Sequence, residues 1–118
     1  MEKQAQFTNK KLSFDKNVDF PELPGVYKFF NSKHEVIYIG KAKNIKNRVK
    51  SYLNIRKGEG KRIAKLKSSI KYIETIITKT ESDALILEQG LISKKRPQFN
   101  IQFRDDKSYP AIHLSTSK

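Results

Sequence analysis

Two cations and a phenol are spaced so that they share one edge of a predicted helix. The stretch over residues 38–53 reads YIGKAKNIKNRVKSYL, in which an apolar strand is followed at once by a basic helix over residues 42–53. At 100° per residue, Lys41, Arg48 and Tyr52 fall within about 40° of one another. An ammonium, a guanidinium and a phenol on one edge can hold a phosphate group.

Two further phenols lie on short apolar segments that predict a β-hairpin. Tyr27 belongs to the first strand and Tyr38 to the second, at positions that antiparallel pairing can bring side by side. Tyrosine in a strand is usually part of a core or of a sheet surface. Next to Lys41 and Arg48, either could act as a general base, because positive charge stabilises the phenolate. The residues do not decide between the two.

Glu88 is the most informative acidic residue. Residues 80–83 (TESD) resemble a capping box, and they predict a helix that ends before Pro97. On that helix, Glu88 lies between Ala84 and Ile92 on the apolar face. A carboxylate there is costly to bury unless it meets a cation. Position alone favours two roles for Glu88 equally. It could be a metal ligand, or a carboxylate paired with Lys or Arg at the rim of the core.

Positive charge is concentrated in one part of the chain. The net charge is +13, and residues 41–71 hold 12 of the 25 basic side chains and one acid, Glu59. This segment therefore carries +11, which leaves +2 for the rest. The clustering predicts a nucleic acid partner, because Lys and Arg release counterions from a phosphate backbone. A solvated lysine-rich surface is the alternative, and a membrane surface is disfavoured because the basic helices lack an exposed bulky apolar face. The expected nucleic-acid contacts are Lys43, Lys46, Lys50, Lys61, Arg62, Lys65 and Lys67.

Length and composition exclude several classes of protein. A chain of 118 residues makes one domain with a single core. It has no run of about 20 apolar residues that could span a membrane, and no apolar signal-peptide core at its N-terminus. Because cysteine is absent, a disulfide framework and a thiolate metal site are excluded. A cytoplasmic location is the default expectation.

The remaining pattern predicts an α+β fold, with a small, mainly antiparallel sheet flanked by basic helices. Residues 1–22 are polar with scattered apolar side chains, which predicts a loosely ordered leader before a domain over residues 23–118. The predicted elements are strands over residues 25–30, 35–39 and 72–78, helices over residues 42–53, 61–71 and 80–96, and a closing hairpin of residues 99–103 and 111–114.

Together these motifs resemble the GIY-YIG nuclease superfamily. The matching residues are GVY at 25–27, YIG at 38–40, K-x6-R-x3-Y from Lys41 to Tyr52, then Glu88, Asn100 and RDDKSYP at 104–110. Val26 stands where the first motif has isoleucine. The last string is similar to the UvrC-type nuclease domains of bacterial nucleotide-excision repair, and the resemblance covers about residues 23–114.

The resemblance implies a metal-dependent endonuclease that hydrolyses a phosphodiester bond in DNA. It implies that Glu88 holds one Mg²⁺ or Mn²⁺ ion, and a single carboxylate suffices where waters and substrate phosphates complete the shell. A UvrC-type domain would make the incision 3′ to a lesion, with UvrA and UvrB as partners. The catalytic residues implied for this sequence are Tyr27, Tyr38, Lys41, Arg48, Tyr52 and Asn100, the last two as supporting residues.

Two alternatives stay open. The chain could be a free-standing GIY-YIG endonuclease, either structure-specific or of a mobile element. It could also be a non-catalytic nucleic-acid-binding module that keeps only the basic face, although the presence of Glu88, Lys41 and Arg48 together with both hairpin tyrosines counts against this class.

Overall fold

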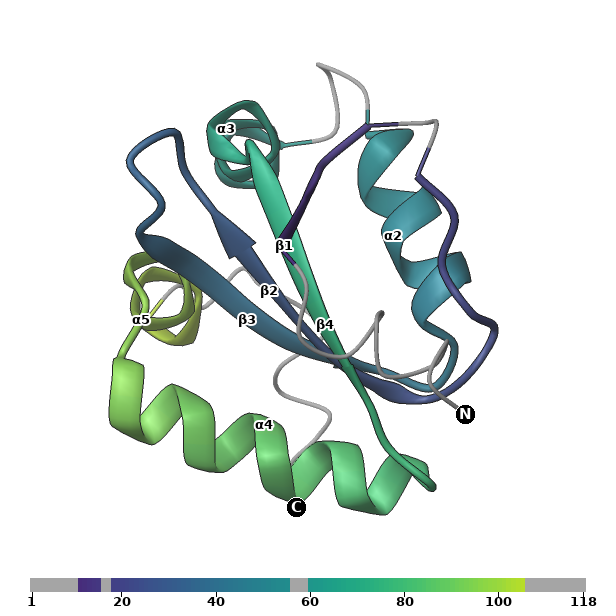
Figure 1. The fold of residues 1–118 in the computed structure, drawn as a ribbon. Helices are drawn as coiled ribbons and strands as arrows, with labels where there is room; N and C mark the ends of the chain where they lie inside the picture. Colours follow the sequence, from purple (N-terminus) through teal and green to yellow (C-terminus); the bar gives the residue numbers. More distant parts are fainter. Residues whose placement is uncertain (1–10, 16–17, 56–59, 106–118) are drawn as a thin grey trace.

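The computed structural model describes residues 11–15, 18–55 and 60–105 of the chain. In this part, four strands form one antiparallel sheet in the order β1-β4-β2-β3, with four helices around it (Figure 1). The α+β class predicted from the sequence is thereby confirmed. The elements are β1 (Lys11–Ser13), β2 (Gly25–Phe30), β3 (Val36–Ala42), α2 (Ile45–Leu53), α3 (Lys61–Ser69), β4 (Tyr72–Ile77), α4 (Glu81–Lys95) and α5 (Gln98–Asp105).

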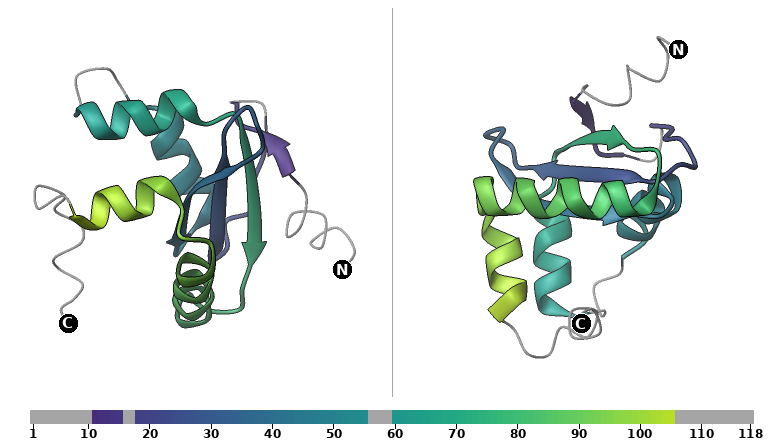
Figure 2. Two further views of the ribbon diagram at one scale, coloured as in Figure 1. Left: turned by 90° about the vertical axis from the view of Figure 1, so that its left-hand side faces the viewer. Right: turned by 90° about the horizontal axis from the view of Figure 1, so that it is seen from below.

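Helices pack on both faces of the sheet, because successive side chains of a strand point to opposite faces. One face carries Tyr27 and Tyr38, which belong to the larger core cluster with residues of α2, α3 and α5. Figure 2 shows these three helices on the same side of the strands. The other face carries Val26 and Ile39, which pack with Ala84 of α4. No helix within the described part of the chain is long and apolar enough to cross a membrane.

The β2–β3 hairpin brings the two tyrosine motifs together. In its register Tyr27 lies opposite Gly40, and Phe29 lies opposite Tyr38. The prediction that Tyr27 and Tyr38 lie side by side is confirmed, since their ring centroids are 6.2 Å apart. Both rings lie on the face that α2 covers.

Part of the segment that we expected to be a loosely ordered leader contributes an edge strand. β1 pairs with β4, and Phe14 packs on Phe29 with ring centroids 5.3 Å apart. Phe20 is 5% exposed and belongs to the larger core cluster. The domain boundary at residue 23 stays a prediction, and the structure adds core residues on its N-terminal side.

The helix that we predicted over residues 42–53 is present as α2 and ends at Leu53, but it begins at Ile45, so its predicted start was wrong. β3 continues to Ala42, and Asn44 caps α2, because its side-chain oxygen accepts a hydrogen bond of 3.0 Å from the N–H group of Asn47. Lys41 is therefore a strand residue. It does not share a helix edge with Arg48 and Tyr52, as the 100° spacing had suggested.

The first turn of α2 has little capacity left to bind an anion through its main chain. The N–H group of Ile45 donates to the carbonyl oxygen of Leu23 at 2.9 Å, and that of Lys46 donates to Pro21 at 3.2 Å. A helix N-terminus binds phosphate through such N–H groups when they are free. Here the preceding segment occupies them, so a phosphate near α2 depends on side chains.

The closing hairpin that we predicted from residues 99–103 is also wrong. These residues belong to the helix α5, in which Phe99 and Phe103 are 2% and 3% exposed while Ile101 is 41% exposed. The second half of that hairpin, residues 111–114, lies outside the described residues.

Candidate active site

Three tyrosines from three elements form the centre of the site. Tyr27 of β2, Tyr38 of β3 and Tyr52 of α2 have ring centroids 5.8 to 6.5 Å apart. All three side chains are buried, with exposed fractions of 1% to 8%. The hydroxyl oxygens of Tyr27 and Tyr52 are 3.3 Å apart, within hydrogen-bond distance. α2 thus delivers a phenol directly onto the hairpin.

Gly40 makes room for the Tyr27 phenol. A Cβ atom added at Gly40 would lie 2.3 Å from the Tyr27 hydroxyl oxygen and 2.4 Å from its ring carbon Cζ. Such distances are far inside van der Waals contact, so any other residue would displace the phenol. The glycine in the YIG motif therefore fixes where the hydroxyl group of Tyr27 lies.

Arg48 projects from α2 toward the same phenols. Arg48 is an exposed residue, and the partial loss of water around its guanidinium would on its own lower the pKa of that group, but the neighbouring Tyr27, Tyr52 and Tyr38 raise that pKa above its ordinary value. Tyr27 also forms a hydrogen bond with the Arg48 side chain. Because a guanidinium has five N–H donors, Arg48 can hold Tyr27 and still offer N–H groups to a phosphate.

Lys41 reaches the site from β3. Its ammonium donates to the carboxylate of Glu81, at the first turn of α4, with an N···O distance of 3.4 Å. Both side chains are partly exposed, at 33% and 47%. The Lys41 side chain therefore joins β3 to α4. Its partner, Glu81, was not singled out from the sequence.

Glu88 lies two helical turns beyond Glu81 on α4 and is half-buried. Burial raises the pKa of the Glu88 carboxyl above its ordinary value. The positive charge of Lys41, its backbone N–H group and the charge of Arg48 act in the opposite direction and only partly offset the burial. The carboxylate is thus left short of positive charge.

This shortage is the property that a divalent cation would correct. The described residues contain no group of three or more His, Cys, Asp and Glu side chains that could hold an ion. A metal at Glu88 would therefore take its other ligands from water and from substrate phosphate, as Mg²⁺ commonly does. The donor set fits a hard cation that is shared with the substrate.

Asn100 supports the site through the backbone of β3. Its Oδ1 atom accepts a hydrogen bond from the N–H group of Ile39 at 2.8 Å, and its Nδ2 atom donates to the Ile39 carbonyl at 2.9 Å. β3 is an outer strand, so these two groups face away from β2. The amide acts there as a short substitute for a neighbouring strand, between Tyr38 and Gly40. Asn100 therefore positions β3.

The predicted nucleic-acid contacts divide between α2 and α3. Lys43 and Lys50 are exposed, while Lys46 is half-buried and pairs with Asp19 at 3.4 Å. Lys43 also lines a shallow groove on the outer side of α2, together with Arg48 and Ser51. On α3, the exposed cations are Lys61, Arg62 and Lys65.

Lys67 has a different environment from the other predicted contacts. Its ammonium donates to the carbonyl oxygens of Leu53 and Ile55, at 3.0 Å each. These carbonyls lie at and just beyond the C-terminus of α2, where a cation is favourable. Its role in nucleic-acid binding stays a prediction, and the structure gives the side chain a bridging role between α3 and α2.

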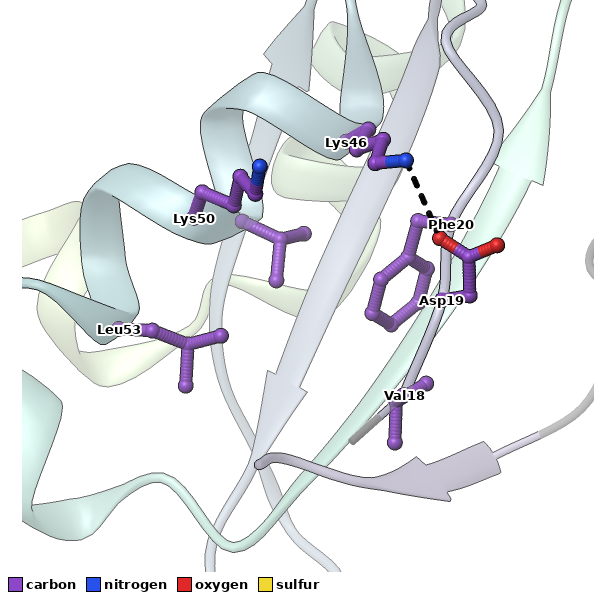
Figure 3. A pocket seen from close by; sticks show the side chains of 7 residues that line it. Val18, Asp19, Phe20, Lys46, Lys50 and Leu53 are labelled. Atoms are coloured by element: carbon purple, nitrogen blue, oxygen red, sulfur yellow. Dashed lines mark ion pairs between the residues drawn. The ribbon is translucent and has the colours of Figure 1, made fainter. Parts of the chain in front are cut away.

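A small cleft of about 150 Å³ lies on the other flank of α2, against the segment that precedes β2 (Figure 3). Phe20 and Leu53 give it an apolar wall, and the ion pair of Lys46 with Asp19 lies at its edge. Neither Glu88 nor any of the three tyrosines lines it. The cleft is therefore separate from the candidate active site.

Sequence reasoning missed Glu81, because nothing in local spacing connects it with a lysine 40 residues earlier. Its only signal was its place in the first turn of a capped helix, where acidic residues are common for reasons of helix stability. The other catalytic candidates lie close together, except Asn100, which contacts the backbone of β3 at Ile39.

Comparison with known proteins identifies relatives of this chain. A family model described as the UvrC-like GIY-YIG domain matches residues 23–101. The UvrABC system protein C of Bdellovibrio bacteriovorus is 50% identical over 101 residues, which is 86% of this chain and 16% of that protein. Its counterpart in Neisseria meningitidis is 46% identical over 114 residues, 91% of this chain and 18% of the relative. The chain thus spans about a sixth of the length of these relatives.

Solved structures agree with the sequence relatives. The N-terminal GIY-YIG endonuclease domain of UvrC from Thermotoga maritima, bound to magnesium as its catalytic divalent cation, is 43% identical and aligns with a TM-score of 0.59 over 67% of this chain and 84% of that one. Structures of three tyrosine-to-phenylalanine variants and one asparagine-to-alanine variant of the same domain also hold the catalytic cation.

Proposed function

This chain belongs to the UvrC-like GIY-YIG family as an endonuclease domain, and we propose that it hydrolyses a phosphodiester bond in DNA with one bound Mg²⁺ or Mn²⁺ ion. The observation that carries this proposal is a half-buried carboxylate, Glu88, close enough to Lys41 and Arg48 for their charges to offset part of the rise in its pKa that burial causes. The magnesium ion in the Thermotoga maritima domain supports the same class of ion here.

Arg48 is the proposed phosphate clamp. It lines the outer groove of α2 and also contacts the buried phenols, so it can bridge a bound strand and the tyrosine cluster. The hydrogen bond with Tyr27 restricts the guanidinium before substrate arrives, which reduces the entropy lost on binding. Its fixed charge then opposes the negative charge that develops on the phosphoryl oxygens.

Tyr27 or Tyr38 accepts the proton of the attacking water in this proposal. Their surroundings differ, because the Tyr27 hydroxyl has hydrogen-bond contacts with both Arg48 and Tyr52. Tyr52 is then a supporting residue that orients Tyr27. The relative's variants at three tyrosines and one asparagine concern the same residue types as Tyr27, Tyr38, Tyr52 and Asn100, which supports assigning these four to the site.

A cation held by Glu88 would supply Lewis-acid stabilisation of charge at the phosphate. Lys41 adds a second, mobile positive charge from β3, and the exposed lysines of α2 and α3 hold the flanking backbone by counterion release.

Cleavage of a labelled duplex in Mg²⁺ or Mn²⁺, with and without chelator, tests the proposal. Glu88→Gln should abolish cutting and leave DNA affinity nearly unchanged. Asp83→Asn is the matched control, since it removes one exposed negative charge from the same helix and should cut normally. Tight DNA binding by the parent without cutting of any duplex, nicked or branched substrate would favour the non-catalytic binding module instead.

The two tyrosines can be separated by their pH profiles. The variant that lacks the general base should lose about 10² to 10⁴ in rate, and its residual rate should no longer rise with pH. The other variant should keep that rise, since its base is intact, and Tyr27→Phe should in addition weaken DNA binding by releasing Arg48. Rates within tenfold of the parent for both Tyr27→Phe and Tyr38→Phe would exclude a tyrosine base.

At the level of the whole system, we propose that the chain makes the incision 3′ to a lesion, on DNA delivered by UvrA and UvrB in the cytoplasm. The support is the name shared by its relatives, UvrABC system protein C. Incision mapped on a single-lesion duplex, with UvrA and UvrB added or withheld, tests it. Cleavage that depends neither on the lesion nor on the presence of UvrA and UvrB would favour a free-standing GIY-YIG enzyme.

A further inference from the structure

Two carboxylates of α4 lie near the same lysine, and only one of them forms an ion pair with it. Glu81 receives the ammonium of Lys41 at 3.4 Å, whereas at Glu88 the charge and the backbone N–H group of Lys41 lower the pKa of the carboxyl. Glu81 and Glu88 are seven residues apart, so they lie on one side of the helix, two turns from each other. The Lys41 ammonium therefore pairs with Glu81, while its charge also acts on Glu88.

The direction of that charge matters for any cation at Glu88. The Lys41 side chain is long and flexible, and its charge already acts on the Glu88 carboxylate. An ammonium that moved onto Glu88 would compensate the carboxylate in place of a divalent ion and would occupy its oxygen atoms. The ammonium and the metal therefore compete for the same group, and the outcome depends on where Lys41 rests.

We propose that Glu81 is a positioning residue that keeps the Lys41 ammonium off Glu88 and so leaves the Glu88 carboxylate open to the divalent cation. This inference rests on the proposed function, in which Glu88 is the metal ligand. It adds a residue that acts through Lys41 rather than on the reacting atoms.

The Lys41–Glu81 pair is suited to this role because it is weak. Its N···O distance is 3.4 Å and both partners are partly exposed to water, which screens their attraction. A substrate phosphate can therefore draw the ammonium away from Glu81 once it is bound. Before that point, the pair is sufficient to bias the resting position of the side chain.

Mn²⁺ binding to the DNA-free protein, followed by electron paramagnetic resonance of the free ion, tests the proposal without relying on turnover. Glu81→Gln should raise the Mn²⁺ dissociation constant by about two- to fivefold, the range that an exposed ion pair provides. Asp83→Asn removes the same charge from the first turn of α4 without touching Lys41, and should change the constant less. Unfolding midpoints of both variants establish that the fold is retained.

The decisive comparison repeats the Glu81→Gln change in a Lys41→Met background. If Glu81 acts through the ammonium, its effect on Mn²⁺ affinity disappears there; a direct attraction between Glu81 and the ion would persist. If the effect of Glu81→Gln persists in the Lys41→Met background, or if Glu81→Gln and Asp83→Asn have equal effects with Lys41 present, this inference is overturned. The proposed metal site at Glu88 is not affected by either result. A Glu88→Gln variant that binds Mn²⁺ as well as the parent overturns the proposed metal site, which is a separate result.

Discussion

Asn100→Ala tests how strongly one side chain holds β3 in place. The two hydrogen bonds of Asn100 to Ile39 are 2.8 and 2.9 Å long, and Ile39 is 0% exposed. The alanine variant leaves one N–H and one carbonyl group without their partner. An unpaired buried group costs about 1 to 3 kcal/mol, so we expect the free energy of unfolding to fall by about 2 to 4 kcal/mol, with some relief from water that enters the vacated space.

Urea denaturation with linear extrapolation measures this loss. Asn44→Ala is a matched control, because it removes one exposed capping hydrogen bond of 3.0 Å and should cost about 1 kcal/mol. The cleavage rate of the Asn100 variant should fall as well, since the shifted strand carries both Tyr38 and Lys41. A loss of stability no greater than that of Asn44→Ala would refute the idea that the amide holds the strand.

Three further predictions follow from the site. Gly40→Ala should displace the Tyr27 phenol, lower the cleavage rate at least tenfold and destabilise the fold by about 1 to 3 kcal/mol. Gly90→Ala, where an added Cβ atom meets no other atom within 4 Å, should leave the cleavage rate unchanged. Equal cleavage rates for the two variants would contradict the steric argument. Because burial raises the folded pKa of Glu88, the ionised carboxylate destabilises the protein at neutral pH, and this penalty disappears below the unfolded value of 4.5. Glu88→Gln should therefore be more stable than the parent at pH 7 without metal and equally stable near pH 3, as urea titrations at the two pH values will show. Removing three exposed cations of α3 should reduce the slope of log affinity against log salt by about two to three, and an unchanged slope would place the DNA elsewhere. The three changes are Lys61→Ser, Arg62→Ser and Lys65→Ser.

The hairpin and the start of α4 could be predicted because their signals are local. Two short apolar segments separated by a turn predicted β2 and β3, and the cap at Thr80 is present as a hydrogen bond of 3.0 Å from the N–H group of Asp83. The early start given to α2 was a failure to recognise Asn44 as an N-cap, a residue type that favours this position.

The helix α5 was misread because its apolar residues fit two periods at once. Phe99, Ile101 and Phe103 alternate as in a strand, but Phe99 and Phe103 are also four residues apart, as on one face of a helix. The exposure of Ile101 shows that the helical period applies. In so short a segment, only the packing against the sheet decides between the two.

The contacts that could not be predicted join residues far apart in the chain. Glu81 meets a lysine 40 residues away, and Lys67 reaches two carbonyl groups 12 and 14 residues away. The sequence predicted a surface cation at Lys67, because local spacing carries no information about the carbonyl groups at the end of another helix. The residue type and the charge at these positions could be taken from the sequence, but the partner of each side chain depends on the fold.

The amide of Asn100 also bears on how separate copies of this protein meet one another. The outer strand of a sheet offers unpaired main-chain groups to a strand of another molecule, which is a common route to aggregation. On β3, Asn100 already occupies both groups of Ile39. The opposite edge, β1, is only three residues long and carries the exposed Lys11. In the described part of the chain, both edges of the sheet are thus poor templates for strand addition, so two copies should have little tendency to pair through their sheets.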